Sequence, residues 1–228
     1  MTAKHEPKRR FGRGPGADIS TPANRRLAKL HFHLADHGLL RILWTNLHPV
    51  ASGVWRSNQP SPRRLARYRD MGIRTVLNLR GARKSSFYLF EKEACAKLGL
   101  ILIDQPIYSR HLVPAERWLG LLESFDRIEK PFVMHCKSGA DRSGIASVLW
   151  LLDQEGASVE EARRQLSRKF IHLKSTRAGV QDHLVDIYEA DSRERPMPIR
   201  QWFAERYDPE AIQASFHEKM GWSAPGGA

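Results

Sequence analysis

The sequence predicts an α/β fold, in which a sheet has helices on both faces and is followed by a helical C-terminal portion. Short apolar or β-branched runs alternate with longer segments of helical spacing from about residue 50 onward, a pattern typical of sheets whose strands are joined by helices. One apolar run, at 131–135, passes through a glycine-containing turn into an apolar helix. Beyond that turn only helical patterns follow.

The segments before the sheet show two different patterns. Residues 1–22 combine glycine, proline and charge without periodicity and are predicted to be a disordered basic tail. Residues 23–49 are predicted to form an N-terminal helical segment, because their apolar positions approximate helical spacing up to an interruption near Gly38. His33 and His37 lie one turn apart in this segment, but a third ligand is not evident, so no metal site is predicted.

Residues 50–190 carry the alternation and are predicted to be the main domain, with a C-terminal helical extension at 191–228. Ser61 followed by Pro62 has the form of a helix N-cap and first-turn proline. The predicted strands are 53–57, 73–79, 100–107 and 131–135, and the predicted helices are 61–72, 86–98, 114–129, 143–154, 158–170 and 176–190.

Composition restricts the function classes. The net charge of +12 calls for an anionic partner or substrate. No recognisable nucleic-acid-binding motif accompanies it, so no specific nucleic acid is expected as a partner. The sequence holds no apolar run of membrane-spanning length and no secretory signal. Its two cysteines, Cys95 and Cys136, exclude a disulfide scaffold and favour a cytoplasmic location. The basic N-terminus is expected to be a solvated tail, with peripheral contact to an acidic membrane as the alternative.

The stretch PFVMHCKSGADRSGIASVLW, residues 131–150, carries the chemistry. A turn from strand to helix directs several backbone N–H groups into one concavity, at the positive end of the helix dipole. Gly139 permits the tight path, and Arg142 adds a planar fork of donors suited to phosphate oxygens. The same positive field is expected to lower the pKa of the Cys136 thiol and to hold it as a thiolate.

These residues predict nucleophilic displacement at phosphorus. The Cys136 thiolate attacks a phosphate monoester, a cysteinyl-phosphate forms, and water hydrolyses it. Arg142 and the loop amides hold the non-bridging oxygens, while Ser143 hydrogen-bonds the sulfur and His135 orders the loop from behind. The chemistry needs neither a metal nor another cofactor. The residues expected to bind the substrate phosphate are Lys137, Ser138, Gly139 and Ala140.

The stretch resembles the signature H-C-x5-R-[S/T] of the cysteine-dependent protein tyrosine phosphatases. The runs VWRSNQPSPRRL, GIRTVLNLRGA, LILIDQPI and HCKSGADRSG also occur in the order and spacing of small bacterial dual-specificity-type phosphatases. The resemblance covers roughly residues 50–190. It implies a central mixed sheet flanked by helices, with the loop at the carboxyl edge of the sheet, and a phosphoric monoester hydrolase activity.

The general acid is left between two aspartates. The family places this residue about thirty positions before the cysteine, and Asp104 lies thirty-two positions before Cys136. The rival is Asp141 inside the loop, in a G-x-D-R arrangement similar to that of myotubularin-type lipid phosphatases. The spacing slightly favours Asp104, and His111 is the third candidate. Cys95 is expected to be structural, with a reversible disulfide to Cys136 as the alternative.

Two substrate classes fit this site. A phosphorylated protein is the default that the resemblance implies. Lys137, the basic tail and the net charge would also suit a phospholipid head group or an inositol phosphate. Arg80 and Arg83 follow a predicted strand and are expected either to rim the pocket or, for Arg80, to pair with an internal acid. A non-catalytic phosphate-binding module is the alternative from another class, and the complete set of loop residues argues against it.

Overall fold

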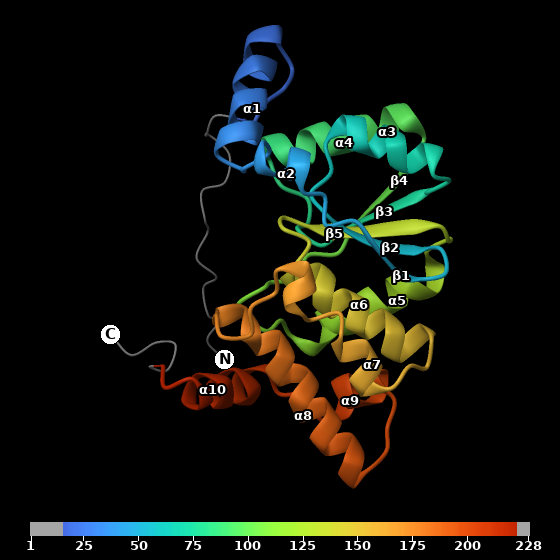
Figure 1. Ribbon diagram of the computed structural model, residues 1–228, viewed down its shortest axis with the longest axis vertical. Coiled ribbons are helices and arrows are strands. Elements are labelled where there is room, and N and C mark those ends of the chain that lie inside the picture. Colours follow the sequence, from blue (N-terminus) through green and yellow to red (C-terminus); the bar gives the residue numbers. More distant parts are fainter. Residues whose placement is uncertain (1–15, 223–228) are drawn as a thin grey trace, which may run out of the picture.

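The computed structural model describes residues 16–222 and arranges them around one five-stranded sheet (Figure 1). The spatial order is β1-β2-β5-β3-β4, with β1 antiparallel to β2 and all other neighbours parallel. The mixed sheet flanked by helices is therefore confirmed. The strands are β1 (His48–Ala51), β2 (Val54–Asn58), β3 (Thr75–Asn78), β4 (Ile101–Asp104) and β5 (Phe132–Cys136).

The parallel register brings the predicted site residues to one edge of the sheet. Cys136, the last residue of β5, pairs with Asn58 of β2. His135 pairs with Asn78 of β3, which in turn pairs with Asp104 of β4. Because the carboxyl ends of these parallel strands lie at the same edge, the loops that follow them meet there. Burial of all five residues of β5 places the strand at the centre of the molecule.

Helices cover both faces of the sheet (Figure 1). One face carries α3 (Pro62–Asp70) and α4 (Ser86–Leu98), and α1 (Pro22–Leu34) and α2 (Leu40–Leu43) lie at the end of that layer. The other side holds α5 (Ala115–Arg127), α6 (Asp141–Gln154), α7 (Val159–Arg163), α8 (Val180–Glu194), α9 (Ile199–Glu205) and α10 (Pro209–Lys219). Two short 3-10 helices, Arg168–Phe170 and Arg177–Gly179, precede α8.

The two faces bury cores of different size. The larger core lies between the sheet and the C-terminal helices and contains Trp118, Trp150 and Trp202, each at most 1 % exposed. The smaller core, under α3 and α4, is mostly aliphatic and includes Leu65 and Val133. Each large buried side chain contributes roughly 2 kcal/mol by leaving water. Packing against the C-terminal helices therefore stabilises the sheet more than packing against α3 and α4 does.

Several predicted elements have the expected bounds. Ser61 caps α3, its hydroxyl accepting a hydrogen bond from the Arg64 N–H at 3.3 Å, and Pro62 is the first helical residue. The helix predicted at 86–98 is α4. The helix predicted at 143–154 starts earlier, at Asp141, because the loop that follows β5 leads directly into its first turn.

Other elements differ from the prediction. The helix predicted at 158–170 ends at Arg163 because the Gln165 carbonyl accepts a hydrogen bond from Arg56 at 2.7 Å, and residues 168–170 form only a 3-10 turn. Strand β1 was not predicted, since its four residues are recognisable only by their pairing with β2. Most of the predicted tail 1–22 lies outside the described residues. The domain boundaries at 50 and 190 stay predictions.

Candidate active site

The loop from Cys136 to Arg142 joins β5 to α6 and encloses the thiol. Cys136 is 2 % exposed, and the Gly139 N–H donates to its Sγ at 3.2 Å. Gly139 has φ of +73°, and a Cβ at this position would lie 2.7 Å from the backbone nitrogen of Asn58. The loop therefore requires glycine here for both conformation and space. The helix N-cap, Ala140, offers no side-chain acceptor, so no capping side chain competes with an anion for the N–H groups of the first turn.

The surroundings of Cys136 favour the thiolate. Burial by itself raises the pKa of this thiol. The Arg142 charge and hydrogen bonds from the Ser143 side chain and backbone outweigh that effect, so the pKa is lowered despite an opposing contribution from Asp141. Ser143 is fully buried, and its hydroxyl also lies 3.4 Å from the Ser57 carbonyl oxygen. The structure thus brings together the predicted nucleophile and its predicted partners.

Arg142 has an unused donor at the loop. Its Nε is buried, and within residues 16–222 it meets no hydrogen-bond acceptor. Burial lowers the pKa of Arg142, the Cys136 charge raises it, and the neighbouring positive charges of Arg80 and Arg83 lower it further. A partly buried guanidinium whose Nε has no acceptor among the described residues, with further cations nearby, is suited to an incoming anion with more than one oxygen.

Arg56 supports the loop from behind and was not singled out in the sequence. It is fully buried on β2, and its Nη2 donates to the carbonyl oxygens of Gly139 and Ala140 at 2.8 and 2.9 Å. Its guanidinium also lies 4.0 Å from the centre of the Phe170 ring. Burial lowers the pKa of Arg56 to about 10. Because Arg56 binds these two carbonyl oxygens on the inner side of the loop, the loop N–H groups face the opposite side, where an anion can bind. The sequence feature that could have identified Arg56 is a charged residue within a predicted strand.

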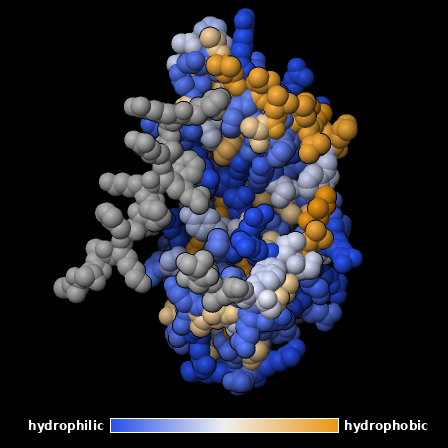
Figure 2. All heavy atoms as spheres, turned by 90° about the vertical axis from the view of Figure 1, so that its left-hand side faces the viewer, coloured by the Kyte–Doolittle hydropathy of each residue, from blue (hydrophilic) through white to orange (hydrophobic). Residues whose placement is uncertain are grey.

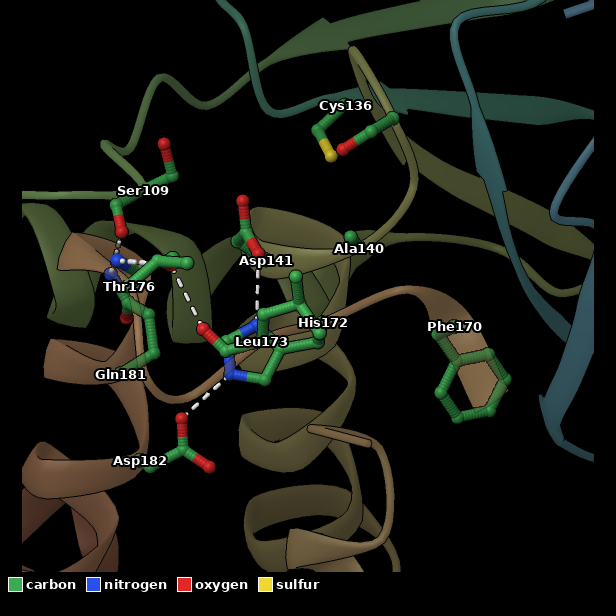
Figure 3. Close-up of polar contacts among 12 residues, drawn as sticks. Ser109, Cys136, Ala140, Asp141, Phe170, His172, Leu173, Thr176, Gln181 and Asp182 are labelled. Carbon is green, nitrogen blue, oxygen red and sulfur yellow. Dashed lines mark hydrogen bonds and ion pairs between the residues drawn. The ribbon is translucent and has the colours of Figure 1, made fainter. Parts of the chain in front are cut away.

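Asp141 is held by a histidine that the sequence reasoning also missed (Figure 3). His172 is buried between two carboxylates, with Nδ1 at 2.8 Å from Asp141 and Nε2 at 2.6 Å from Asp182 of α8. Burial would lower the pKa of His172, but the hydrogen bonds to Asp141 and Asp182 raise it to about 9. Figure 3 shows the second Asp141 oxygen pointing away from His172, toward the side on which Cys136 lies.

Asp104 occupies a different environment, at the end of the edge strand β4. One of its carboxylate oxygens accepts from Asn78 and the other from the Tyr88 hydroxyl, both at 2.7 Å. Its charge contributes to raising the pKa of Cys95, after burial and Glu91, to about 12. Both oxygens of Asp104 therefore already have partners, and its neighbours belong to the α4 side of the sheet.

The remaining predicted residues surround the loop. His135 is fully buried, with Nε2 at 2.7 Å from Glu91 of α4. The Ser138 carbonyl accepts from the Asn46 side chain at 3.1 Å. Lys137 is partly exposed, with its Nζ at 3.9 Å from Asp36. These contacts connect the loop to α4, to the turn between α1 and α2 and to the segment before β1.

Arg80 pairs with an internal acid, one of the two predicted alternatives. Its Nη2 lies 2.7 Å from Asp36, and its Nη1 contacts Gln59 at 2.8 Å. Asp36 lies between α1 and α2 and also binds Arg41 at 2.7 Å. The turn of the N-terminal segment is therefore attached directly to the cationic side of the active site.

No group of three or more histidine, cysteine, aspartate or glutamate side chains in the described ranges is arranged to hold a metal ion. None of the helices described is long and apolar enough to cross a membrane.

Comparison with solved structures identifies the fold. TpbA from P. aeruginosa superposes with a TM-score of 0.50 at 15 % identity, covering 75 % of this chain and 91 % of TpbA. Tk-PTP in its active form gives 0.51 at 24 % identity, covering 64 % and 98 %. A DUF442 protein from Shewanella putrefaciens CN-32 gives 0.51 at 14 % identity, covering 66 % and 97 %. The fold expected from the phosphatase signature is thus confirmed. No protein-family model matches the sequence, and no curated protein is similar to it.

Proposed function

We propose that this chain is a cysteine-dependent phosphatase that hydrolyses phosphate monoesters through a cysteinyl-phosphate intermediate. The observation that carries the proposal is the loop itself. It combines a buried thiol of lowered pKa, a helix N-terminus without a side-chain cap and an Arg142 Nε without an acceptor among the described residues. The shared fold with Tk-PTP supports this proposal.

The chemistry follows from the positions of the side chains. The Cys136 sulfur forms a bond to phosphorus as the bond from phosphorus to the ester oxygen breaks in line. The amides of residues 137–142 and the Arg142 guanidinium bind the non-bridging oxygens throughout. Water then attacks the cysteinyl-phosphate, and the Ser143 hydrogen bond stabilises the departing thiolate. Phosphate is released and the enzyme is restored.

For the general acid that protonates the leaving oxygen, the geometry favours Asp141 over Asp104. Asp141 lies in the loop and shares a proton with His172, whereas both Asp104 oxygens are occupied by Asn78 and Tyr88. The proton held by the Asp141–His172 pair passes to the leaving oxygen in the first step. The pair recovers a proton from the attacking water in the second step. Asp182 keeps the imidazole oriented.

The site favours substrates that carry more than one anionic group. Lys137, Arg80 and Arg83 bring positive charge to the Arg142 side of the loop, and Asp36 is the acid paired with this cluster. A phosphorylated protein remains the first substrate class, as a tyrosine or dual-specificity phosphatase would use. The cationic cluster favours, as the second class, phosphoinositides, other phospholipid head groups or inositol phosphates. The cytoplasmic location and the contact of the basic N-terminus with membranes stay predictions.

Cys136→Ser is the first test. We expect hydrolysis of p-nitrophenyl phosphate to disappear, while the melting temperature and phosphate binding stay close to those of the wild type. Arg142→Lys should be severely impaired, because an ammonium cannot replace two directed donors. Cys95→Ser is the matched control and should stay active. Turnover by Cys136→Ser would refute the mechanism, and phosphate binding without turnover in the wild type would identify a binding module.

The assignment of the acid is tested with aryl phosphates whose phenols differ in pKa. Asp141→Asn should lose rate most steeply for the most basic phenols, since these need protonation most. Asp104→Asn should lower the hydrolysis rate by the same factor for every aryl phosphate, or leave the rate unchanged. The reverse pattern would return the role to Asp104. If neither variant shows the dependence, His111 or the substrate supplies the proton. A panel of phosphopeptides and phosphoinositides then decides between the substrate classes.

A further inference from the structure

The N-terminal helices expose an unusual amount of apolar surface. Figure 2 shows a hydrophobic band in the upper part of the molecule, where α1 and α2 lie. The large apolar side chains that are at least half exposed in this segment are Leu27, Leu30, Leu34, Leu39, Leu40, Ile42 and Leu43. Scattered single leucines need no explanation, but a continuous row of this length marks an interaction surface.

Helix α1 has two apolar stripes, of which the fold uses only one. Ala28 and Phe32 are buried against α4, where the Phe32 ring packs edge-on to Phe90 at 6.5 Å. Leu27, Leu30 and Leu34 have the spacing of a second stripe and remain exposed. Within residues 16–222, the exposed stripe therefore contributes little to holding α1 in place.

A cationic cavity lies beside this row. It measures about 580 Å³ and is bounded by α1, α2, α3 and α4. Ile42 and Phe32 contribute to its walls, so the cavity and the apolar row are continuous. Five basic side chains line it, and within the described ranges no carboxylate does: Lys29, Arg41, Arg63, Arg64 and Arg67.

Buried donors in the cavity wall have no acceptor in the described part of the chain. These are the Nε groups of Arg41 and Arg64 and the Nε2 group of Gln59, on side chains at most 7 % exposed. Leaving such a donor without a partner is unfavourable, because the group has lost its hydrogen bonds to water and gained none in return. An anion with several oxygens would satisfy these donors and balance the charge of the lining.

We propose that the docking face, meaning the seven exposed apolar residues and the adjoining cavity, binds a bilayer that contains anionic phospholipids. The leucines enter the boundary of the acyl chains, and the cavity receives a lipid phosphate group. The first fifteen residues carry five basic side chains and one acidic one, so their charge opposes occupation of a cationic cavity. The net charge of +12 likewise opposes pairing of two copies through this face.

The docking face adjoins the active site. Asp36, between α1 and α2, bonds to Arg80 and lies 3.9 Å from the loop residue Lys137. Docking would therefore hold the catalytic loop close to the lipid surface. The binding itself goes beyond the phosphatase proposal and does not depend on it, because none of the residues of the docking face takes part in the chemistry.

The test is co-sedimentation of the full chain with phosphatidylcholine vesicles, with and without phosphatidylglycerol. The variants are Leu40→Ser with Leu43→Ser, which removes apolar contact, and Arg63→Gln with Arg67→Gln, which removes charge. Ile101→Ser is the apolar control, because Ile101 is also more than half exposed but lies on β4. Arg127→Gln with Arg164→Gln is the charge control, on α5 and after α7, with both side chains 74 % exposed.

We expect binding only to vesicles with phosphatidylglycerol. Both test variants should lose about tenfold or more in affinity, because each buried leucine or neutralised charge is worth about one to two kcal/mol and 1.4 kcal/mol is tenfold. Both controls should bind as the wild type does, and all variants should keep the activity toward p-nitrophenyl phosphate.

Several results would overturn the proposal. Equal binding by the leucine variant and the wild type would assign vesicle contact to the basic N-terminus alone. Equal binding to vesicles with and without phosphatidylglycerol would show that binding does not require anionic lipid. Arg63- and Arg67-dependent binding of inorganic phosphate without vesicle binding would make the cavity a site for free phosphate. A dimer in solution that Leu40→Ser with Leu43→Ser dissociates would make the face an interface between copies.

Discussion

The helices at the two ends of the chain attach to the sheet in different ways. The C-terminal helices α8, α9 and α10 bury their apolar side chains, and Trp202, Phe203 and Phe216 are at most 2 % exposed. The N-terminal pair α1 and α2 leaves most of its leucines exposed and is attached largely through polar contacts, among them Asp36–Arg80 and Arg25–Glu93. One end of the chain completes the core, whereas the other presents a surface.

The largest expected effect is on the C-terminal side. Trp202 is fully buried, packs on Phe203 and Tyr207, and donates from Nε1 to Asp191 at 2.6 Å. Trp202→Ala should lower the free energy of unfolding by about 3–5 kcal/mol. Leu43→Ala, at a side chain 96 % exposed, should change it by less than about 0.5 kcal/mol. Urea denaturation measures both, and equal losses would break the comparison.

A second prediction concerns alkaline pH, where the C-terminal side weakens. The pKa of His172 rises from 6.5 to about 9 in the fold, so its contribution is complete below pH 6.5 and disappears as the pH rises through 9. The free energy of unfolding should fall by about 3 kcal/mol, because a change of one in pKa corresponds to roughly 1.4 kcal/mol. His172→Gln should remove this dependence. A stability profile between pH 6 and 10 that is the same for both proteins would contradict it.

The smallest expected effect is on the N-terminal side and has the opposite pH dependence. Burial raises the pKa of Asp36, but Arg80, Arg41 and Lys137 lower it below 3.8, so its contribution is present above pH 3.8 and lost below. Asp36→Asn should cost about 2 kcal/mol, because two arginines lose a charged acceptor. Hydrogen exchange should show faster amides in α1 and unchanged amides in α9. Faster exchange in both helices would mean that the ends are not independent.

The sequence predicted what is local in the chain. Cys136, Gly139, Arg142 and Ser143 lie within eight residues, so one turn with its flanking strand and helix was enough to predict the loop. The α/β alternation predicted the sheet for a similar reason, because strand and helix patterns repeat at short range.

What the sequence did not predict depends on distant contacts. Arg56 reaches Gly139 across 83 positions, and His172 joins Asp141 to Asp182 across 31 and 10. No pattern of spacing identifies such partners, because the fold alone brings them together. Strand β1 was missed for the same reason, since its identity depends on β2. The spacing that favoured Asp104 took no account of Asn78 and Tyr88, which occupy its oxygens.

The buried position of Arg56 has a consequence for protein engineering. Because this side chain and the close approach of Gly139 to Asn58 set the loop backbone from the inside, the shape of the loop does not depend on the side chains at its rim. Lys137 and Ser138 are only partly buried and contribute little to that shape. If the chain is the phosphatase proposed above, saturation libraries at these two positions should therefore change its selectivity without disturbing the surroundings of Cys136. The same library at Arg56 or Gly139 would yield mostly inactive proteins.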